Sequence, residues 1–349
     1  MIRPALALCA TLTTTTVSPT PTLAADLDHI RRAGALAVIA EVRQGDRIQR
    51  AATGRTKLGS PATPTGREHF RAGSIVKSFV ATVILQLVGE GRLALDDTVA
   101  TVLELGEDRV ELASRVTVRH LLTHSSGVPE YLPDGEIPGG TLASRFRTWD
   151  PRELVALSRR HERPFEPGAA QAYSNTNYVL LGMMIERVTG RDFGEEIRRR
   201  IVIPLGLKDT EVPGARTTIR GPHLHGYLDG SVDVSRFNLT VAAASGNLNS
   251  TTADLNRFYR ALLTGRLLPP ALLRLMTTGQ EYGMGLGLKQ TPCGLVVGHT
   301  GTAFGYQTMS FHLADGSRQA SISYTPRTGR ELAATNEVLW RRLCPSVKP

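Results

Sequence analysis

"FRAGSIVKSF", residues 70–79, places a serine and a lysine three residues apart at the start of a long apolar run. From Gly73 to Gly89 the chain reads GSIVKSFVATVILQLVG, and Lys77 is the only charged residue in it. The apolar residues recur at helical spacing but extend around almost the whole circumference, which predicts a helix buried by its neighbours. Lys77 is therefore expected to lie in the core of the protein.

A lysine buried beside a serine suggests chemistry rather than packing. Desolvation disfavours the ammonium form and lowers the pKa of a buried lysine. Positions i and i+3 share a helix face, so the Lys77 amine can reach the hydroxyl of Ser74, which is predicted at the N-cap. Together they would form an activated serine nucleophile. The alternative is that Ser74 only caps the helix while the Lys77 side chain extends to solvent.

Strand patterns occur at both ends of the chain. Residues 34–53 predict a hairpin that turns at 44–46, and residues 307–324 predict another that turns at 315–316. Between these ends, helical patterns occur at residues 75–90, 118–124, 151–160, 177–189 and 253–264. We expect an α+β fold in which both chain ends form one antiparallel sheet (about 30–70 and 245–349), flanked by helices, with a mostly α-helical inserted region at about 75–244.

The first 25 residues have the composition of a secretory signal peptide. MIRPALALCATL combines one positive charge with a short apolar run, and a Thr/Ser/Pro-rich stretch then leads to TLAAD. We expect cleavage near Ala24 or Ala25, which would leave residues 26–349 as a secreted, single catalytic domain. No apolar run reaches the roughly 18 residues of a membrane span, so no stable membrane anchor is expected.

Two cysteines lie outside the signal, Cys293 and Cys344. An even count in an oxidising compartment favours one disulfide between them, which would tie a strand to the C-terminal helix. A catalytic cysteine is the weaker alternative, because no C-x-x-C spacing occurs. The net charge of +9 is scattered along the chain apart from "RRR" at 198–200. This pattern does not favour a nucleic-acid partner, and we expect a monomer.

"YSN", residues 173–175, precedes an apolar helix that should end at Gly190, a common C-cap residue. In an extended loop, Tyr173 and Asn175 project from the same side. Tyr173 can relay protons and Asn175 can bind a substrate amide. Alternatively, Asn175 caps the helix and Tyr173 only packs.

"HTGT", residues 299–302, ends a predicted strand. Gly301 indicates close approach of another backbone or a ligand. The hydroxyls of Thr300 and Thr302 can hold a carboxylate, and His299 supplies a positive or hydrogen-bonding group whose charge can change near neutral pH. Taken alone, the segment could be an ordinary strand end. S-x-x-K, Tyr-x-Asn and a K-T-G-type box in this order, however, form the motif set of penicillin-interacting serine enzymes.

The sequence resembles the serine β-lactamase and D-Ala-D-Ala peptidase superfamily, and most of all the secreted D-alanyl-D-alanine carboxypeptidases of its class C-like branch. The resemblance covers about residues 30–344 and rests on FRAGSIVKSF, HLLTHSSGV, PGAAQAYSNTNYVLLGMMIE, STTADL, GLGL and GHTGTAFGY. It implies a β-lactamase/transpeptidase-like fold and a serine hydrolase without a cofactor. It also implies peptidoglycan stem peptides ending in D-Ala-D-Ala as substrates, β-lactams as inhibitors and a disulfide at Cys293 and Cys344.

The same resemblance implies roles for individual residues. Ser74 would attack the penultimate D-Ala carbonyl, and Lys77 and Tyr173 would share the proton transfers. The backbone N–H groups of Ser74 and Thr302 would form the oxyanion hole. Asn175 would hold the amide on the acyl side. The terminal carboxylate would face His299, Thr300, Gly301 and Thr302.

Two positions depart from the carboxypeptidase pattern. Lys289 stands where an arginine usually helps to bind the terminal carboxylate, and a lysine lacks the two-pronged guanidinium. Val241 stands where the carboxypeptidase has an aromatic wall. Both departures leave the substrate preference open.

Several other functions are compatible with parts of the sequence. On the same scaffold, a class C-like β-lactamase, an esterase or a D-aminopeptidase would share Ser74, Lys77 and Tyr173. A non-catalytic penicillin or peptidoglycan sensor would be acylated once and then stop. His120 and His124 have the i, i+4 spacing of zinc ligands, but the glutamate of H-E-x-x-H is missing, so no metal site is expected. G-x-S-x-G does not occur.

Overall fold

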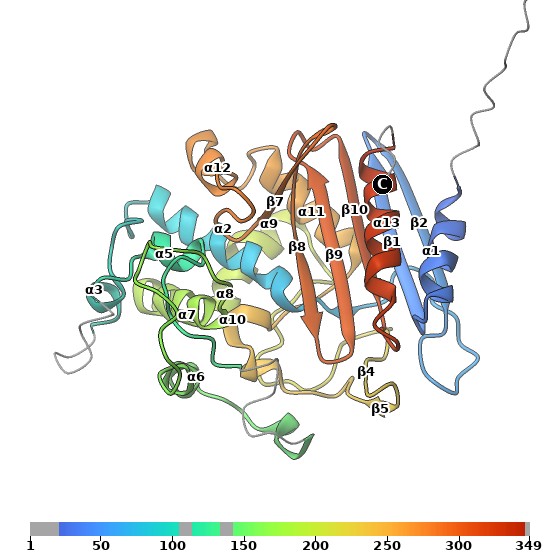
Figure 1. The fold of residues 1–349 in the computed structure, drawn as a ribbon, viewed down its shortest axis with the longest axis horizontal. Coiled ribbons are helices and arrows are strands. Elements are labelled where there is room, and N and C mark those ends of the chain that lie inside the picture. The colour runs from blue at the N-terminus through green and yellow to red at the C-terminus, as the bar shows by residue number, and fades with distance from the viewer. Residues whose placement is uncertain (1–20, 105–113, 133–141, 346–349) are drawn as a thin grey trace, which may run out of the picture.

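A six-stranded antiparallel sheet joins the two ends of the chain (Figure 1). The structure is a computed structural model that describes residues 21–104, 114–132 and 142–345. β1 pairs with β10, which confirms the α+β class and the sheet predicted from both chain ends. The strands lie in the order β2-β1-β10-β9-β8-β7, with bounds β1 Ala37–Gln44, β2 Arg47–Gly54, β7 Gly287–Thr291, β8 Gly294–Ala303, β9 Tyr306–Leu313 and β10 Arg318–Tyr324.

Helices cover both faces of this sheet (Figure 1). Strand alternation sends Val38 toward α1 (Leu23–Arg32) and α13 (Glu331–Leu343), and Ile39 toward the larger core on the other face. α2 (Val76–Gly89) and α11 (Thr252–Leu263) belong to that larger core. In α1, Leu23 is buried in the first helical turn, and the cleavage expected near Ala24 or Ala25 would cut inside this turn.

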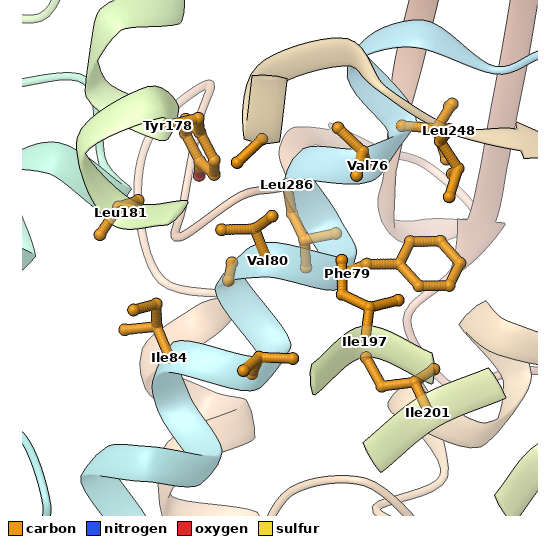
Figure 2. Close-up of a cluster of buried hydrophobic side chains, with 14 of the residues drawn as sticks. Val76, Phe79, Val80, Ile84, Tyr178, Leu181, Ile197, Ile201, Leu248 and Leu286 are labelled. Carbon is orange, nitrogen blue, oxygen red and sulfur yellow. The ribbon is translucent and has the colours of Figure 1, made fainter. Parts of the chain in front are cut away.

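The predicted helix after Ser74 is α2, and it is buried nearly all round. In Figure 2 its side chains project toward several neighbours, among them Tyr178, Leu181, Ile197 and Leu286. Phe79 stacks on Phe258 of α11 with ring centroids 3.7 Å apart. The prediction of an N-cap was wrong: Ser74 lies inside a 3-10 turn, Gly73–Ile75, and makes no capping hydrogen bond. This turn tightens the chain ahead of the helix.

The middle of the chain supplies most of the remaining helices. The predicted helical segments are confirmed as α2, α5, α6, α7 and α11, and Gly190 ends α7 in the left-handed region with φ of 71°. None of the helices in the described part of the chain is long and apolar enough to cross a membrane. The further elements are α3 Val99–Leu103, α5 Val118–Leu122, α6 Pro151–Ser158, α7 Asn175–Thr189, α8 Phe193–Ile197, α9 Ile203–Leu205, α10 Ala243–Gly246, α12 Pro270–Met276, and the short strand pairs β3 (Phe70–Arg71) with β6 (Asn249–Ser250) and β4 (Tyr227–Leu228) with β5 (Val232–Asp233).

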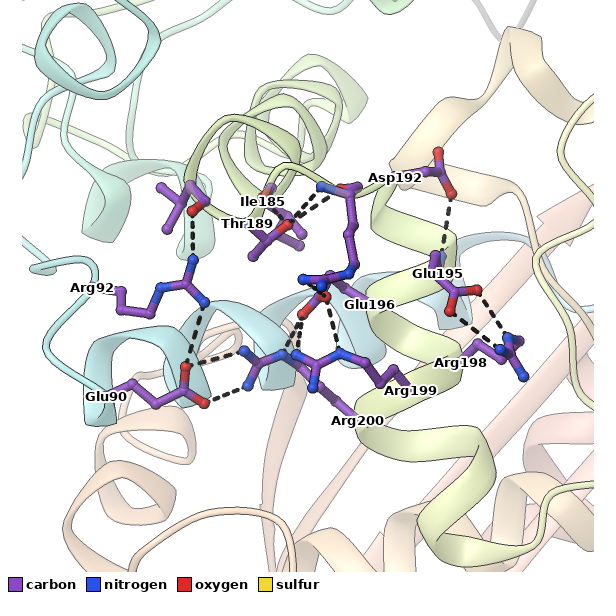
Figure 3. Close-up of polar contacts among 12 residues, drawn as sticks. Glu90, Arg92, Ile185, Thr189, Asp192, Glu195, Glu196, Arg198, Arg199 and Arg200 are labelled. Carbon is purple, nitrogen blue, oxygen red and sulfur yellow. Dashed lines mark hydrogen bonds and ion pairs between the residues drawn. The ribbon is translucent and has the colours of Figure 1, made fainter.

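An ion-pair network fixes the end of α2 against α8 (Figure 3). The carboxylate of Glu196 in α8 is buried and accepts from Arg199 and Arg200. Arg200 also donates to Glu90, the residue after α2, at 2.5 and 3.0 Å. Arg198, the first of the "RRR" cluster, pairs with Glu195. The three arginines at 198–200 are therefore paired with carboxylates of the same protein.

A disulfide joins Cys293 to Cys344, as expected. Cys293 lies in the turn between β7 and β8, and Cys344 follows α13 directly. Their Cα atoms are 5.8 Å apart. The bond attaches the C-terminal helix to the sheet hairpin whose second strand reaches the candidate site.

Candidate active site

The turn that carries Ser74 packs directly against β8. A Cβ atom on Gly73, whose φ is 56°, would lie 2.5 Å from the carbonyl oxygen of Thr302, and one on Gly301 would lie 2.0 Å from that of Ala72. Only glycine allows this approach at both positions. As a result, Ser74 and Thr302 border the same cavity, where their backbone N–H groups are candidates for an oxyanion hole.

Lys77 is fully buried, and its amine has three partners. Nζ lies 2.9 Å from Ser74 Oγ, 2.8 Å from Asn175 Oδ1 and 2.6 Å from the carbonyl oxygen of Ser245. A neutral amine has two N–H donors and one lone pair. Lys77 can therefore donate to Asn175 and Ser245 while its lone pair accepts the proton of the Ser74 hydroxyl.

The surroundings of Lys77 favour its neutral form. Desolvation by burial lowers the pKa of Lys77 to about 7, and the negative charge of Glu130 acts in the opposite direction. A base with a pKa close to the working pH suits proton transfer from a serine. The geometry thus supplies both the contact and the protonation state that a Ser–Lys pair needs.

Tyr173 brings a protonated phenol to the same place. It lies in the loop before α7, with 45% of its surface exposed. Desolvation of the hydroxyl raises its pKa above the ordinary value of 10, while a hydrogen bond to the Ser74 side chain acts the other way. Lys77 Nζ lies 4.9 Å from the centroid of its ring. Tyr173 can therefore donate a proton near Ser74, and it becomes a base only by passing that proton on.

Glu130 belongs to the site, and the sequence prediction missed it. One carboxylate oxygen accepts from the backbone N–H and the side-chain amide of Asn175, at 2.8 and 2.9 Å. The other accepts from the backbone N–H of Leu132 at 3.0 Å. These bonds orient the Asn175 amide so that its oxygen faces Lys77. Glu130 follows "HLLTHSSGVP" in the sequence, but its contact with Asn175, 45 residues away, is visible only in the fold.

His299 is buried and uncharged, so of the two expected roles, a positive group or a hydrogen-bonding group, the structure favours the second. Nδ1 donates to the carbonyl oxygen of Thr300 at 2.5 Å, so Nε2 accepts from the Tyr282 hydroxyl at 2.9 Å. Burial, with a smaller contribution from the charge of Lys77, lowers the pKa of His299 to about 3. His299 therefore orders its neighbours by hydrogen bonds and offers no positive charge to a carboxylate.

A cavity of about 570 Å³ opens in front of Ser74. Its polar wall includes Ser74, Tyr173, Asn175, Ser245, Thr300 and Thr302, and its apolar wall includes Leu132, Leu228, Leu239, Ala242, Ala303 and Phe304. Val241, expected at this wall, is buried behind it, and its carbonyl accepts from Tyr131. Phe304 supplies an aromatic surface to the cavity in its place.

Lys289 does not join the site, contrary to expectation. Its neighbour Leu288 packs into the core that contains α2, so strand alternation turns Lys289 to the opposite face of the sheet. There its ammonium lies 4.4 Å from the ring centroid of Trp340 in α13. Among the described residues that line the cavity, none carries a positive charge.

His120 and His124 both accept hydrogen bonds from the backbone at Nδ1. Nδ1 of His120 accepts from the backbone N–H of Thr117, and Nδ1 of His124 accepts from that of Ser174 at 3.2 Å. The described ranges contain no group of three or more His, Cys, Asp or Glu residues placed to hold a metal ion.

The chain matches the sequence pattern of the family described as Beta-lactamase over residues 21–325. It is 28% identical over 277 residues to penicillin-binding protein 4* of Bacillus subtilis, covering 70% of this chain and 58% of that protein. It is also 28% identical over 293 residues to a D-aminopeptidase of Brucella anthropi, covering 80% and 54%. The chain thus spans little more than half the length of these curated relatives.

The chain also resembles several solved structures in its fold. A D-stereospecific amidohydrolase from Streptomyces sp. superposes with a TM-score of 0.82 at 34% identity, over 94% of this chain and 100% of that one. D-amino acid amidase from Ochrobactrum anthropi superposes with a TM-score of 0.79 at 28% identity, over 92% and 98%. A penicillin-binding protein homologue from Pyrococcus abyssi, described as octameric, has a TM-score of 0.73 at 25% identity and covers 88% of this chain and 74% of its own.

Proposed function

Because this chain belongs to the Beta-lactamase family of serine hydrolases, we propose that it hydrolyses amide bonds whose acyl part is a D-amino acid with a free α-amino group. Ser74 attacks the carbonyl carbon while Lys77 takes the hydroxyl proton. The N–H groups of Ser74 and Thr302 stabilise the oxyanion. Tyr173 gives its proton to the leaving amine and takes back the proton that Lys77 received from Ser74, so Lys77 is neutral again when water attacks the acyl carbon. Water then releases the D-amino acid from Ser74. Lys77 and Tyr173 are coupled, so the first proton transfer is assigned to the two residues together.

The carboxylate of Glu130 carries this proposal. It accepts from the amide of Asn175, which lines the cavity, and its negative charge acts on Lys77. A substrate ammonium near Asn175 would be attracted by this charge, and a substrate carboxylate there would be repelled. The D-configuration is supported by the names of relatives, a D-aminopeptidase and D-stereospecific amidases.

A D-alanyl-D-alanine carboxypeptidase acting on peptidoglycan stem peptides is the second candidate. The hydroxyls of Thr300 and Thr302 at the cavity favour it, since they suit a terminal carboxylate. The neutral His299 and the distant Lys289 weigh against it, because neither offers a charge to that group. β-Lactams would acylate Ser74 in either case. A β-lactamase, an esterase and a sensor would differ from both candidates in how fast the acyl-enzyme on Ser74 is hydrolysed.

Export and a monomeric state also remain proposals. The disulfide between Cys293 and Cys344 supports an oxidising compartment. The octameric relative from Pyrococcus abyssi makes the oligomeric state a question for measurement by light scattering.

The deciding experiment compares three amides: D-phenylalanine amide, its N-acetyl derivative, and diacetyl-L-lysyl-D-alanyl-D-alanine. We expect turnover of the first and a loss of at least about 50-fold in kcat/KM on acetylation. Glu130→Gln should reduce this preference for the free amine, and Ser74→Ala should abolish turnover. Preferred cleavage of the D-Ala-D-Ala peptide would overturn the proposal in favour of the carboxypeptidase. Intact mass after addition of benzylpenicillin would separately report a Ser74 acyl-enzyme and its lifetime.

A further inference from the structure

Arg71 is a fully buried cation three residues before the nucleophile. It lies in β3, the short strand that leads into the turn of Ser74. Its Nη2 donates to the carbonyl oxygens of Thr217, Ser235 and Phe237, at 2.8, 2.6 and 3.1 Å. These three carbonyls come from a segment about 150 residues farther along the chain. Arg71 therefore ties that segment to the strand that carries the nucleophile.

This burial is costly and needs a reason. Charged groups are rarely buried without a carboxylate partner, yet the hydrogen bonds of Arg71 go to carbonyl groups. Its Nε and Nη1 have no hydrogen-bond partner among the described residues. Burial lowers the pKa of Arg71 to about 10, so the side chain is still a cation at neutral pH. One nitrogen, Nη2, reaches three carbonyl oxygens at once and so clamps their segment to β3.

The clamp acts on a wall of the active-site cavity. The ring of Phe237, whose carbonyl Arg71 holds, stacks on the ring of Phe304 with centroids 3.9 Å apart and an angle of 14°. Phe237 is fully buried, whereas Phe304 lines the cavity. Phe304 sits in the turn after β8 with a φ of 27°, a backbone conformation that side chains rarely adopt. Leu239 and Leu228 lie in the same apolar cluster and also line the cavity.

The direction of β8 assigns this wall to one side of the substrate. From Thr300, on the side expected for the leaving group, the strand passes Thr302 of the oxyanion hole and ends at Ala303, directly before Phe304. Phe304 therefore lies on the acyl side. The amine of a D-amino acid would face Glu130 there, and its side chain would face Phe304 and the leucines.

We propose that Arg71 is a positioning residue for substrate selectivity: it clamps the segment of Ser235 and Phe237 so that the Phe237–Phe304 pair forms a fixed apolar wall for a large, above all aromatic, acyl side chain. The identity of that side chain as part of a D-amino acid rests on the proposed function above. Without the clamp, three carbonyls lose their donor and the wall behind Phe304 becomes loose. Binding of a large acyl group then suffers, while attack on a small one does not.

The test uses p-nitrophenyl esters, which need Ser74 but no amine recognition. The selectivity ratio is kcat/KM for the 3-phenylpropionate ester divided by kcat/KM for the acetate ester. We expect Phe304→Ala to lower this ratio at least about tenfold. We expect Arg71→Gln to lower it by a similar factor, mainly through a higher KM for the large ester. Arg71→Lys keeps the charge, but its side chain ends one bond short of the Nη2 position and cannot reach the three carbonyls, so it should lower the ratio at least threefold. Arg198→Gln, a surface arginine, should leave it unchanged.

Each outcome decides a separate point. If Phe304→Ala leaves the ratio unchanged, Phe304 does not form the wall for the acyl side chain. If Arg71→Gln lowers kcat/KM equally for both esters, Arg71 acts on folding alone. If Arg71→Gln does not fold, Arg71→Lys decides, and a wild-type ratio there overturns the clamp. Ester hydrolysis that survives Ser74→Ala would instead refute the proposed function, whereas a failure of amine preference alone leaves the ester test intact.

Discussion

At the scale of single residues, the site depends on which charges are present at neutral pH. Lys77 is buried with three polar partners, and its pKa is lowered to about 7. His299 is neutral because burial lowers its pKa to about 3. Glu130 is the carboxylate whose charge acts on Lys77. With a pKa of about 7, the Lys77 amine is partly in the neutral form that can take the Ser74 proton at neutral pH, and one negative charge lies nearby.

The pH dependence of ester hydrolysis should report Lys77. Only the neutral amine can take the Ser74 proton, so kcat/KM should rise with pH, about tenfold per unit, and level off above an inflection near 7. The negative charge of Glu130 raises the pKa of Lys77, so Glu130→Gln should move the inflection to lower pH. The measurement is a profile with p-nitrophenyl acetate from pH 5 to 9.

Thr300→Ser serves as the matched control in that profile, because it changes a cavity residue without changing a charge. A profile that is flat between pH 6 and 8, or a shift to higher pH in Glu130→Gln, would refute the assignment of Lys77 as the titrating base.

At the scale of elements, the site exists because two backbones touch. The 3-10 turn Gly73–Ile75 and strand β8 approach so closely that a Cβ on Gly301 would overlap the carbonyl oxygen of Ala72. α2 continues from this turn and is surrounded by core side chains, so the turn has little freedom to withdraw. The relative position of Ser74 and Thr302 is therefore a property of the element contact.

Gly301→Ala should separate these elements. The added methyl would have to displace backbone atoms, which widens the distance between the N–H groups of Ser74 and Thr302. The loss of one oxyanion donor in related chemistry lowers kcat about 100-fold or more, and we expect a loss of that order. Burst kinetics with a p-nitrophenyl ester would measure it.

Gly190→Ala is the control for this substitution. Gly190 has a positive φ, 71°, unlike Gly301, but no atom lies within 4 Å of a Cβ placed on it. Its replacement should cost about 1 kcal/mol of stability and leave the acylation rate unchanged. Near-normal acylation in Gly301→Ala would show that the contact of the two elements does not set the oxyanion hole.

At the scale of the whole molecule, the two ends of the chain hold the site together. β1 and β10 pair across the sheet, and α1 and α13 lie together on its outer face. The Cys293–Cys344 disulfide links α13 to the β7–β8 turn. Because β8 also carries His299 and Thr302, the C-terminal region supports one wall of the cavity from behind.

Removal of the disulfide should affect stability more than activity. The bond closes a loop over a sequence separation of 51 residues, and the chain-entropy relation gives a contribution of about 4 kcal/mol for such a loop. We expect the Cys293→Ser/Cys344→Ser double variant to show a clearly lower Tm by calorimetry. Its kcat/KM well below that Tm should stay within about twofold of the wild type. An unchanged Tm would contradict this prediction.

Much of the fold could be predicted because its signals are local. Helical and strand periodicity and the turns at Gly45 and Gly316 gave the elements, and the strand patterns at both ends gave the shared sheet. The predictions were wrong where a residue distant in sequence decides the local structure. Ser74 lies in a 3-10 turn because β8 packs against it, and Lys289 faces Trp340 because Leu288 fills the core.

The sequence by itself determined the family, the buried Ser–Lys pair and the pairing of the two cysteines, because motif spacing and composition need no third partner. Tertiary structure alone decided the charges and walls of the site. Burial makes His299 neutral, and tertiary packing brings Glu130 to Asn175 and Phe304 against Phe237. The physical reason is that a pKa and a pocket depend on atoms distant in sequence, through desolvation and close packing, which spacing along one chain does not encode.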